Sequence, residues 1–114
     1  MAVPHPQVAR GLAFIKAHFN EPITLDDISQ NCGMSRNGLE RAFVKHLGVT
    51  PSAELRLMRI AQAKKMLTET EDKLGRIAFD CGYSNSSNLG VAFKRAVGMT
   101  PRAYRLKYAI NRGG

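Results

Sequence analysis

Two segments of the chain repeat one another, and this repeat limits the fold more than any other feature of the sequence. Residues 25–35 (LDDISQNCGMS) match residues 74–84 (LGRIAFDCGYS) at an offset of 49, with five identities. One extra residue then enters the second copy, and seven more identities follow at an offset of 50, beginning at residue 39. Twelve ordered identities across about 30 residues indicate a duplicated structural unit.

The first copy predicts a helix, a tight turn and a second helix. Thr24 and Asp27 have the spacing of a capping box, which predicts where the first helix begins. Gly33 suits the left-handed conformation that ends a helix. Ser35 can cap the second helix, and Gly48 is expected to end it. This is the spacing of a helix-turn-helix unit.

The second copy predicts the same unit with a slightly longer turn. Gly82 takes the place of the turn glycine, Ser84 that of the helix cap, and Gly98 that of the final glycine. The periodicity of apolar residues indicates which face of each second helix is buried. The residues expected on these two buried faces are Leu39, Ala42, Phe43 and Leu47 in the first copy, and Leu89, Ala92, Phe93 and Val97 in the second.

Three more helices are predicted around the two copies. An N-terminal helix ends before Asn20, and Thr50–Pro51 and Thr100–Pro101 each open a further helix. The helix from Pro51 to Thr68 or Glu69 would be roughly 27 Å long. Its expected apolar positions are Leu57, Ile60, Ala61, Met66 and Leu67. The predicted fold is all-α, with seven helices in two helix-turn-helix subdomains (1–50 and 70–114) joined by a long central linker helix (51–69).

Enzyme chemistry finds no support in the sequence. Cys32 and Cys81 occupy equivalent positions before the turn glycines, where packing in the core is expected. His5, His18 and His46 lack the spacing of metal ligands. No nucleophile, acid–base pair or glycine-rich phosphate loop emerges. We therefore expect a non-enzyme without a metal site or a cofactor.

The charge of the chain suits a polyanionic partner. It carries 17 Lys and Arg against 9 Asp and Glu, which gives a net charge of +8. No apolar run approaches the roughly 20 residues that cross a bilayer, and the N-terminus lacks the pattern of a secretory signal. This charge suits either nucleic acid or an acidic membrane surface. Together with the duplicated helix-turn-helix unit, it leads us to expect a cytoplasmic, nucleoid-associated protein that binds double-stranded DNA and no membrane.

In a helix-turn-helix unit the second helix enters the major groove of DNA. In the first copy, its outward face would carry side chains that can pair with base edges: arginine with guanine, asparagine with adenine and glutamate with cytosine. The alternative is a solvated face in which Arg36 and Glu40 pair within the helix. The base-reading candidates of the first copy are Arg36, Asn37, Glu40 and Arg41, and Lys45 is expected at a phosphate.

The matching face of the second copy carries shorter side chains. Serines discriminate weakly between bases, and Val91 can contact only a thymine methyl group, or nothing. Residues 94–112 hold six basic residues, including Arg112, and no acidic one, which favours contacts with the DNA backbone over a merely solvated face. The base-facing candidates are Asn85, Ser86, Ser87 and Val91, and the phosphate candidates are Lys94, Arg95 and Arg102.

The chain resembles the DNA-binding domain of the AraC/XylS family of bacterial transcription regulators over about residues 7–108. The residues that carry the resemblance are the segment 77–83 (IAFDCGY), Ser87–Asn88–Leu89, Phe93–Lys94, Gly98, Thr100–Pro101 and Tyr104–Arg105, with Arg59–Ile60, Ala63 and Leu67 in the linker helix. The resemblance implies seven helices, recognition helices at 35–47 and about 85–97 in successive major-groove segments, and contact with RNA polymerase. Relatives usually carry a sensing or dimerisation domain, which we expect to be absent from this chain.

Gly38 and Gly90 lie inside the two predicted recognition helices, where glycine costs about 1 kcal/mol relative to alanine. Two interpretations are open, a close approach to DNA and simple tolerance of glycine.

Two other functions also remain open: a non-specific architectural DNA binder, and a basic helical adaptor for a protein or an acidic membrane.

Overall fold

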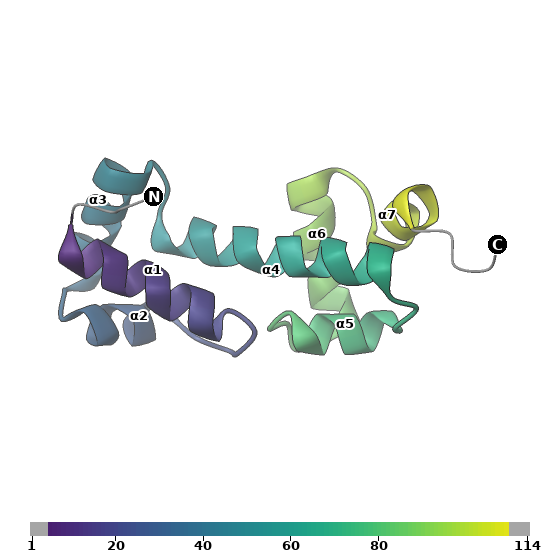
Figure 1. Ribbon diagram of the computed structural model, residues 1–114, viewed down its shortest axis with the longest axis horizontal. Coiled ribbons are helices and arrows are strands. Elements are labelled where there is room, and N and C mark those ends of the chain that lie inside the picture. Colours follow the sequence, from purple (N-terminus) through teal and green to yellow (C-terminus); the bar gives the residue numbers. More distant parts are fainter. Residues whose placement is uncertain (1–4, 110–114) are drawn as a thin grey trace. The chain divides into compact units, whose positions relative to one another are not determined.

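The computed structural model describes residues 5–109, and over this range the chain forms seven α-helices and no strand (Figure 1). This confirms the all-α prediction. Arg112, part of the predicted basic segment, lies outside the described residues. The helices are α1 (Pro6–His18), α2 (Leu25–Cys32), α3 (Arg36–Leu47), α4 (Pro51–Glu69), α5 (Leu74–Asp80), α6 (Ser86–Val97) and α7 (Pro101–Tyr108).

The chain divides into two compact units, Met1–Met58 and Arg59–Gly114, so the boundary falls within α4. We call them the first and the second unit. Each has a hydrophobic core of its own. The buried residues of the first core are Val8, Ile15, Ile28, Cys32, Leu39, Phe43 and Leu55. Those of the second are Ile60, Ala63, Met66, Leu67, Ile77, Ala78, Cys81, Leu89 and Phe93.

In the first unit, α1 packs against both α2 and α3. Gly11 makes this close packing of α1 achievable. A Cβ atom at Gly11 would lie 3.0 Å from the Cys32 sulfur and 3.0 Å from a ring carbon of Phe43. Both neighbours are fully buried, so neither can move aside without disturbing the core.

The helix boundaries of the first unit follow the predicted signals. Thr24 Oγ1 accepts a hydrogen bond from the Asp27 N–H at 3.2 Å, and the Thr24 N–H donates to Asp27 Oδ2 at 2.8 Å, which completes the capping box. Gly33 ends α2 with a φ of 70°, a left-handed conformation that favours glycine. Ser35 Oγ accepts from the Gly38 N–H at 3.1 Å and so caps α3.

The second unit departs from prediction at its turn. The cap of α6 is Asn85, whose side-chain oxygen accepts from the Asn88 N–H at 2.8 Å. Ser84, which the repeat assigned to this role, instead accepts a hydrogen bond from the Asn88 side-chain amide at 2.6 Å. The extra residue in the turn moves the start of the helix along the chain by one position. The N-cap of α5 is Lys73, which makes no side-chain capping bond.

The predicted apolar positions of α4 were partly wrong. Leu57 is 58% exposed and Ala61 is exposed, whereas Leu55 and Ala63 are buried. The physical reason is that α4 serves two cores: Leu55 packs in the first, and the buried residues from Ile60 onward pack in the second. One continuous apolar stripe therefore does not describe this helix.

Arg105 of α7 binds the end of α4. Its Nε donates to the Leu67 carbonyl oxygen at 3.0 Å, and its Nη2 donates to the Thr70 carbonyl oxygen at 3.1 Å. A guanidinium group can satisfy two carbonyls at a helix end because its donors diverge in one plane. This contact, between residues more than 30 positions apart, holds α7 against the C-terminal end of α4 within the second unit. Among residues 5–109, no helix has the length and apolar composition required to span a membrane.

Candidate nucleic-acid interface

The outward face of α3 is set by its buried residues. Leu39 and Phe43 are fully buried, and this fixes the rotation of the helix about its axis. The polar candidates predicted on the opposite side are exposed, except Glu40, which is half-buried. The exposed ones are Arg36, Asn37, Arg41 and Lys45. Val44, half-exposed on the same helix, is an apolar neighbour that the sequence reasoning did not include.

Arg36 pairs with a residue of the preceding helix. Its Nε lies 3.4 Å from Asp26 Oδ1 on α2, and both side chains are 61% exposed. A surface pair of this kind contributes about 0–1 kcal/mol and is screened by salt. The Arg36 side chain can therefore exchange this partner for a phosphate or a guanine edge at little cost.

The outward face of α6 combines short side chains with cations. Ser86 and Ser87 are exposed, and Val91 is 64% exposed although it is apolar. Asn85 is exposed too, and its side-chain oxygen accepts the capping hydrogen bond of α6, while its NH₂ group can donate to another partner. The predicted phosphate contacts of this unit, Lys94, Arg95 and Arg102, are all exposed.

A shallow groove of about 780 Å³ runs along this face of the second unit. It brings Ser86, Ser87, Val91 and all three predicted phosphate contacts into one surface, and the fourth base-facing candidate, Asn85, is not part of its lining. It also includes Leu74 of α5, which the sequence reasoning did not place near α6. The lining residues are Leu74, Ser86, Ser87, Gly90, Val91, Lys94, Arg95, Thr100, Pro101 and Arg102.

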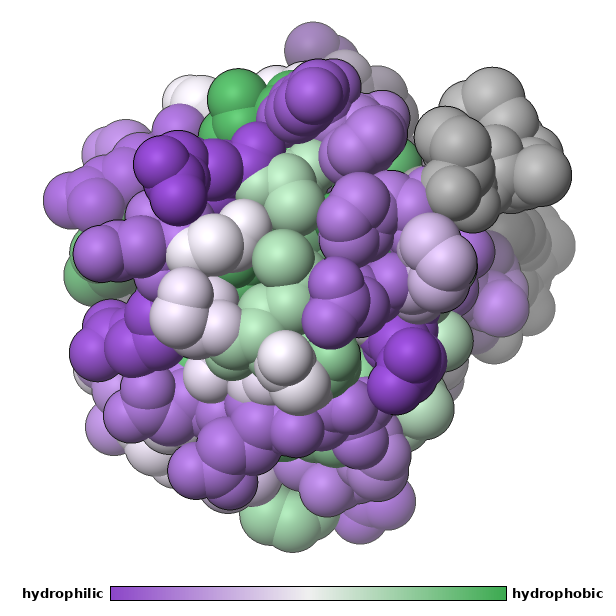
Figure 2. Space-filling view, turned by 90° about the vertical axis from the view of Figure 1, so that its left-hand side faces the viewer, coloured by the Kyte–Doolittle hydropathy of each residue, from purple (hydrophilic) through white to green (hydrophobic). Residues whose placement is uncertain are grey.

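The two units share the positive charge unequally. The first, Met1–Met58, has six Lys and Arg against five Asp and Glu, a net charge of +1. The second, Arg59–Gly114, has eleven against four, a net charge of +7. On the surface of the first unit that Figure 2 shows, hydrophilic side chains surround a paler strip of mildly hydrophobic ones. Because the second unit carries +7 of the net charge of +8, it supplies almost all of the long-range attraction for a polyanion.

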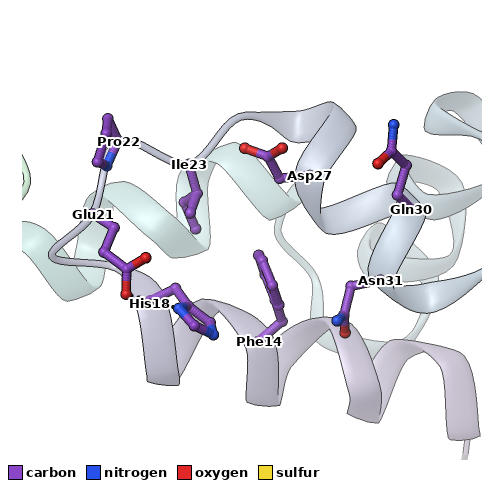
Figure 3. Close-up of a pocket in the computed structure, with 8 residues that line it drawn as sticks. All are labelled: Phe14, His18, Glu21, Pro22, Ile23, Asp27, Gln30 and Asn31. Carbon is purple, nitrogen blue, oxygen red and sulfur yellow. Dashed lines mark hydrogen bonds and ion pairs between the residues drawn. The ribbon is translucent and has the colours of Figure 1, made fainter.

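A separate hollow lies on the first unit, and its residues come from α1, the turn after it and α2 (Figure 3). The Glu21 carboxylate points toward His18, whose Nδ1 lies 2.8 Å from Glu21 Oε2, and the Phe14 and His18 rings lie 4.6 Å apart. Among the described residues that line this hollow, there is no hydroxyl or thiol nucleophile and no candidate from α3. Its lining residues are Phe14, His18, Glu21, Pro22, Ile23, Asp27, Gln30 and Asn31.

Both cysteines pack in the cores, as predicted. Cys32 is 1% exposed and Cys81 is fully buried. Burial raises the pKa of the Cys81 thiol to about 12, and burial likewise raises the pKa of Cys32. Both side chains are therefore neutral thiols near pH 7. Within the part of the chain that the structure describes, no three His, Cys, Asp or Glu residues gather as metal ligands would.

Known proteins share this sequence pattern. A family model described as a helix-turn-helix domain matches residues 28–107. The chain is 33% identical over 101 residues to the HTH-type transcriptional regulator ArgR of Pseudomonas aeruginosa, which covers 89% of this chain and 31% of that protein. It is 34% identical over 94 residues to the HTH-type transcriptional activator RhaR of Klebsiella pneumoniae, which covers 82% and 34%. The chain thus spans about a third of the length of these relatives, and their regulatory names agree with the expected non-enzyme.

Solved structures share the fold. The C-terminal domain of AraT, a response regulator from Geobacillus stearothermophilus, has a TM-score of 0.94 at 28% identity, with coverage of 99% of this chain and 94% of that one. The DNA-binding domain of the transcriptional factor AdpA, in complex with a target DNA, has a TM-score of 0.84 at 27% identity, with coverage of 91% and 94%. These matches confirm the resemblance found in the sequence. The chain belongs to the AraC-type helix-turn-helix family of DNA-binding domains.

Proposed function

We propose that this chain binds duplex DNA at a specific sequence and serves as the DNA-binding part of a bacterial transcription regulator. In this proposal α3 and α6 enter successive major-groove segments of one asymmetric site. The observation that carries it is the contrast between two equivalent helices. Both are oriented by a buried Leu–Phe pair, Leu39 and Phe43 in α3 and Leu89 and Phe93 in α6, and they present different outward side chains.

The roles of the side chains follow from their chemistry. Arg36, Asn37, Glu40 and Arg41 read base edges through hydrogen bonds, and Lys45 contacts a phosphate. On α6, Ser86, Ser87 and Val91 face the bases, and the Asn85 amide group donates to them. Lys94, Arg95 and Arg102 bind phosphates, which give affinity and register without sequence information. In the cell such a chain acts at the nucleoid and contacts RNA polymerase.

Selection of bound sequences from a random duplex pool, followed by footprinting, tests this proposal. Because α3 and α6 differ, the selected site should be asymmetric, with two protected major-groove segments about 34 Å apart. The chain should prefer this site over bulk genomic DNA by roughly 10³-fold or more. A footprint that covers one major-groove segment would refute the two-helix arrangement.

Two other outcomes would identify the alternatives. Equal affinity for the selected site and for genomic DNA would indicate an architectural binder, a role that the net charge of +7 in the second unit could support. Binding to anionic vesicles at physiological salt with no binding to duplex DNA would indicate a basic adaptor. The same preparation of the chain can be used in all three assays.

A further inference from the structure

The two glycines inside the recognition helices have different surroundings. A Cβ atom at Gly38 would lie 3.0 Å from Ser35 Oγ, the atom that caps α3, so the fold itself favours glycine there. A Cβ atom at Gly90 would meet no atom within 4 Å beyond its chain neighbours and the adjacent backbone of α6. Packing within the chain therefore explains Gly38 and does not explain Gly90.

Gly90 weakens α6 without any gain inside the protein. Glycine in a helix interior is less favourable than alanine because its backbone loses more freedom on folding. Gly90 lies at the fifth residue of the twelve-residue helix α6 and has an ordinary helical backbone, not the positive φ that requires glycine. An advantage of Gly90 must therefore come from outside the chain.

The surface around Gly90 has the character of a major-groove contact. Gly90 and Val91 line the groove of the second unit together with Leu74, and these three give it an apolar part. Lys94 and Arg95 lie one turn further along α6 on the same groove. The cations complement DNA phosphates, whereas the apolar part offers no hydrogen bond to a base edge.

We propose that the surface formed by Gly90 and Val91 receives the 5-methyl group of a thymine in the major groove. This inference rests on the proposed function, since it assigns a base to one part of that interface. Thymine is the only base of DNA that presents a methyl group in the major groove. The missing side chain at Gly90 lets the backbone of α6 approach the base, and the exposed Val91 methyl groups contact the thymine methyl.

The equivalent residues of the first unit show why contact with a thymine methyl group is expected of α6 and not of α3. At the offset of 50, Gly90 corresponds to Glu40 and Val91 corresponds to Arg41. Glu40 and Arg41 are long and polar, so they hold a helix backbone further from the bases and discriminate by hydrogen bonds. At these two positions the second unit discriminates by shape and apolar contact.

A uracil scan tests the assignment directly. Each thymine of the selected site is replaced in turn by deoxyuridine, which removes the methyl group and keeps the base pair. One position in the half of the site bound by α6 should lose about fourfold in affinity, which corresponds to about 0.8 kcal/mol for one buried methyl group. Val91→Ala should reduce the difference between thymine and uracil at that position, because alanine keeps one methyl group where valine has two.

Gly90→Ala gives the second test, and Gly75→Ala is its matched control. Gly75 lies in α5, is exposed, and also has no atom within 4 Å of an added Cβ, but it does not line the groove. Gly90→Ala should raise Tm by a few degrees and lower the affinity for the selected site at least tenfold. Gly75→Ala should keep full affinity without lowering Tm.

The outcomes separate the inference from the function on which it rests. If the chain selects a specific site but no thymine is sensitive to uracil, or Gly90→Ala binds as tightly as the unaltered chain, the methyl-reading surface is wrong and specific binding stands. If no site is selected, the proposed function fails and the inference fails with it.

Discussion

The first and second units share one scaffold but differ in almost everything that faces outward. Their cores place Phe43 and Phe93 in equivalent, fully buried positions. Outside the cores, the first unit has a net charge of +1 and long polar side chains on α3, whereas the second has a net charge of +7 and short side chains on α6. Duplication thus preserved the packing and left the surface free to diverge.

This difference divides the proposed task. Hydrogen bonds from α3 can distinguish base pairs, while the charge of the second unit supplies attraction for any duplex. A recognition helix with small outward side chains depends on close contact, and a strongly basic surface around it supplies the attraction for that contact. The comparison therefore predicts different phenotypes for equivalent positions, and the following experiments test it.

The largest effects are expected where the units are alike. Phe43→Ala and Phe93→Ala should each lower the free energy of unfolding by about 3–5 kcal/mol, because each removes a ring from a dense core and leaves a cavity. Hydrogen exchange measured by NMR should show lost amide protection chiefly in the unit that carries the change. Equal loss throughout the chain in both variants would show that the cores unfold as one.

Arg41→Ala should cost about 1–3 kcal/mol of binding free energy and relax the preference at one base pair. The loss should be largest on the selected site and small on unrelated duplexes, as measured by competition binding. Arg10→Ala, which removes an exposed arginine of α1, is the control for charge. Weakening by the same factor on every sequence would reassign Arg41 to a phosphate.

Lys94→Ala, unlike Arg41→Ala, should weaken binding without changing the preference for any base pair. Its loss should weaken all duplexes nearly equally and lower the slope of log affinity against log salt by about 0.9, the value for one phosphate contact. Titrations at several salt concentrations measure this slope. Lys16→Ala on α1 controls for net charge. An unchanged slope would exclude a phosphate contact at Lys94.

The smallest effects concern the caps of α2 and α5, the first helices of the two helix-turn-helix motifs. Thr24→Ala should destabilise the first unit by about 1 kcal/mol, since it removes the capping box of α2. Lys73→Ser should stabilise the second by about 0.5–1 kcal/mol, because Lys73 makes no side-chain capping bond to α5. Urea unfolding measures both changes. If Lys73→Ser has no effect, the difference in capping between the units does not influence their stability.

Much of the fold could be predicted from the sequence because its signals are local. Thr24, Asp27, Gly33 and Ser35 each act on residues only three or four positions away, and all four do what their spacing indicates. The error at Ser84 arose where the local pattern changes: an inserted residue gives the capping position to Asn85, which is an equally good cap. Periodicity alone cannot choose between adjacent capping residues.

The remaining misses depend on tertiary contacts. Leu55 and Leu57 are chemically identical and two residues apart. Leu55 is buried because it packs into the core of the first unit, whereas Leu57 is exposed. The ion pair of Arg36 with Asp26 and the proximity of Leu74 to α6 likewise join separate helices. The candidate side chains could be named from the sequence because the buried stripe of each helix determines which residues are exposed. The groove on the second unit could not be predicted from the sequence, because it forms between helices.

The contact of Arg105 with the end of α4 changes how the basic segment should be counted. Arg105 belongs to a stretch that looks uniformly available for a polyanion, yet its guanidinium already holds two carbonyl oxygens. A cation that is committed to the protein releases few counterions from DNA. An ion-linkage measurement on this chain should therefore show almost the same dependence of affinity on salt whether residue 105 is arginine or an uncharged residue that preserves the fold.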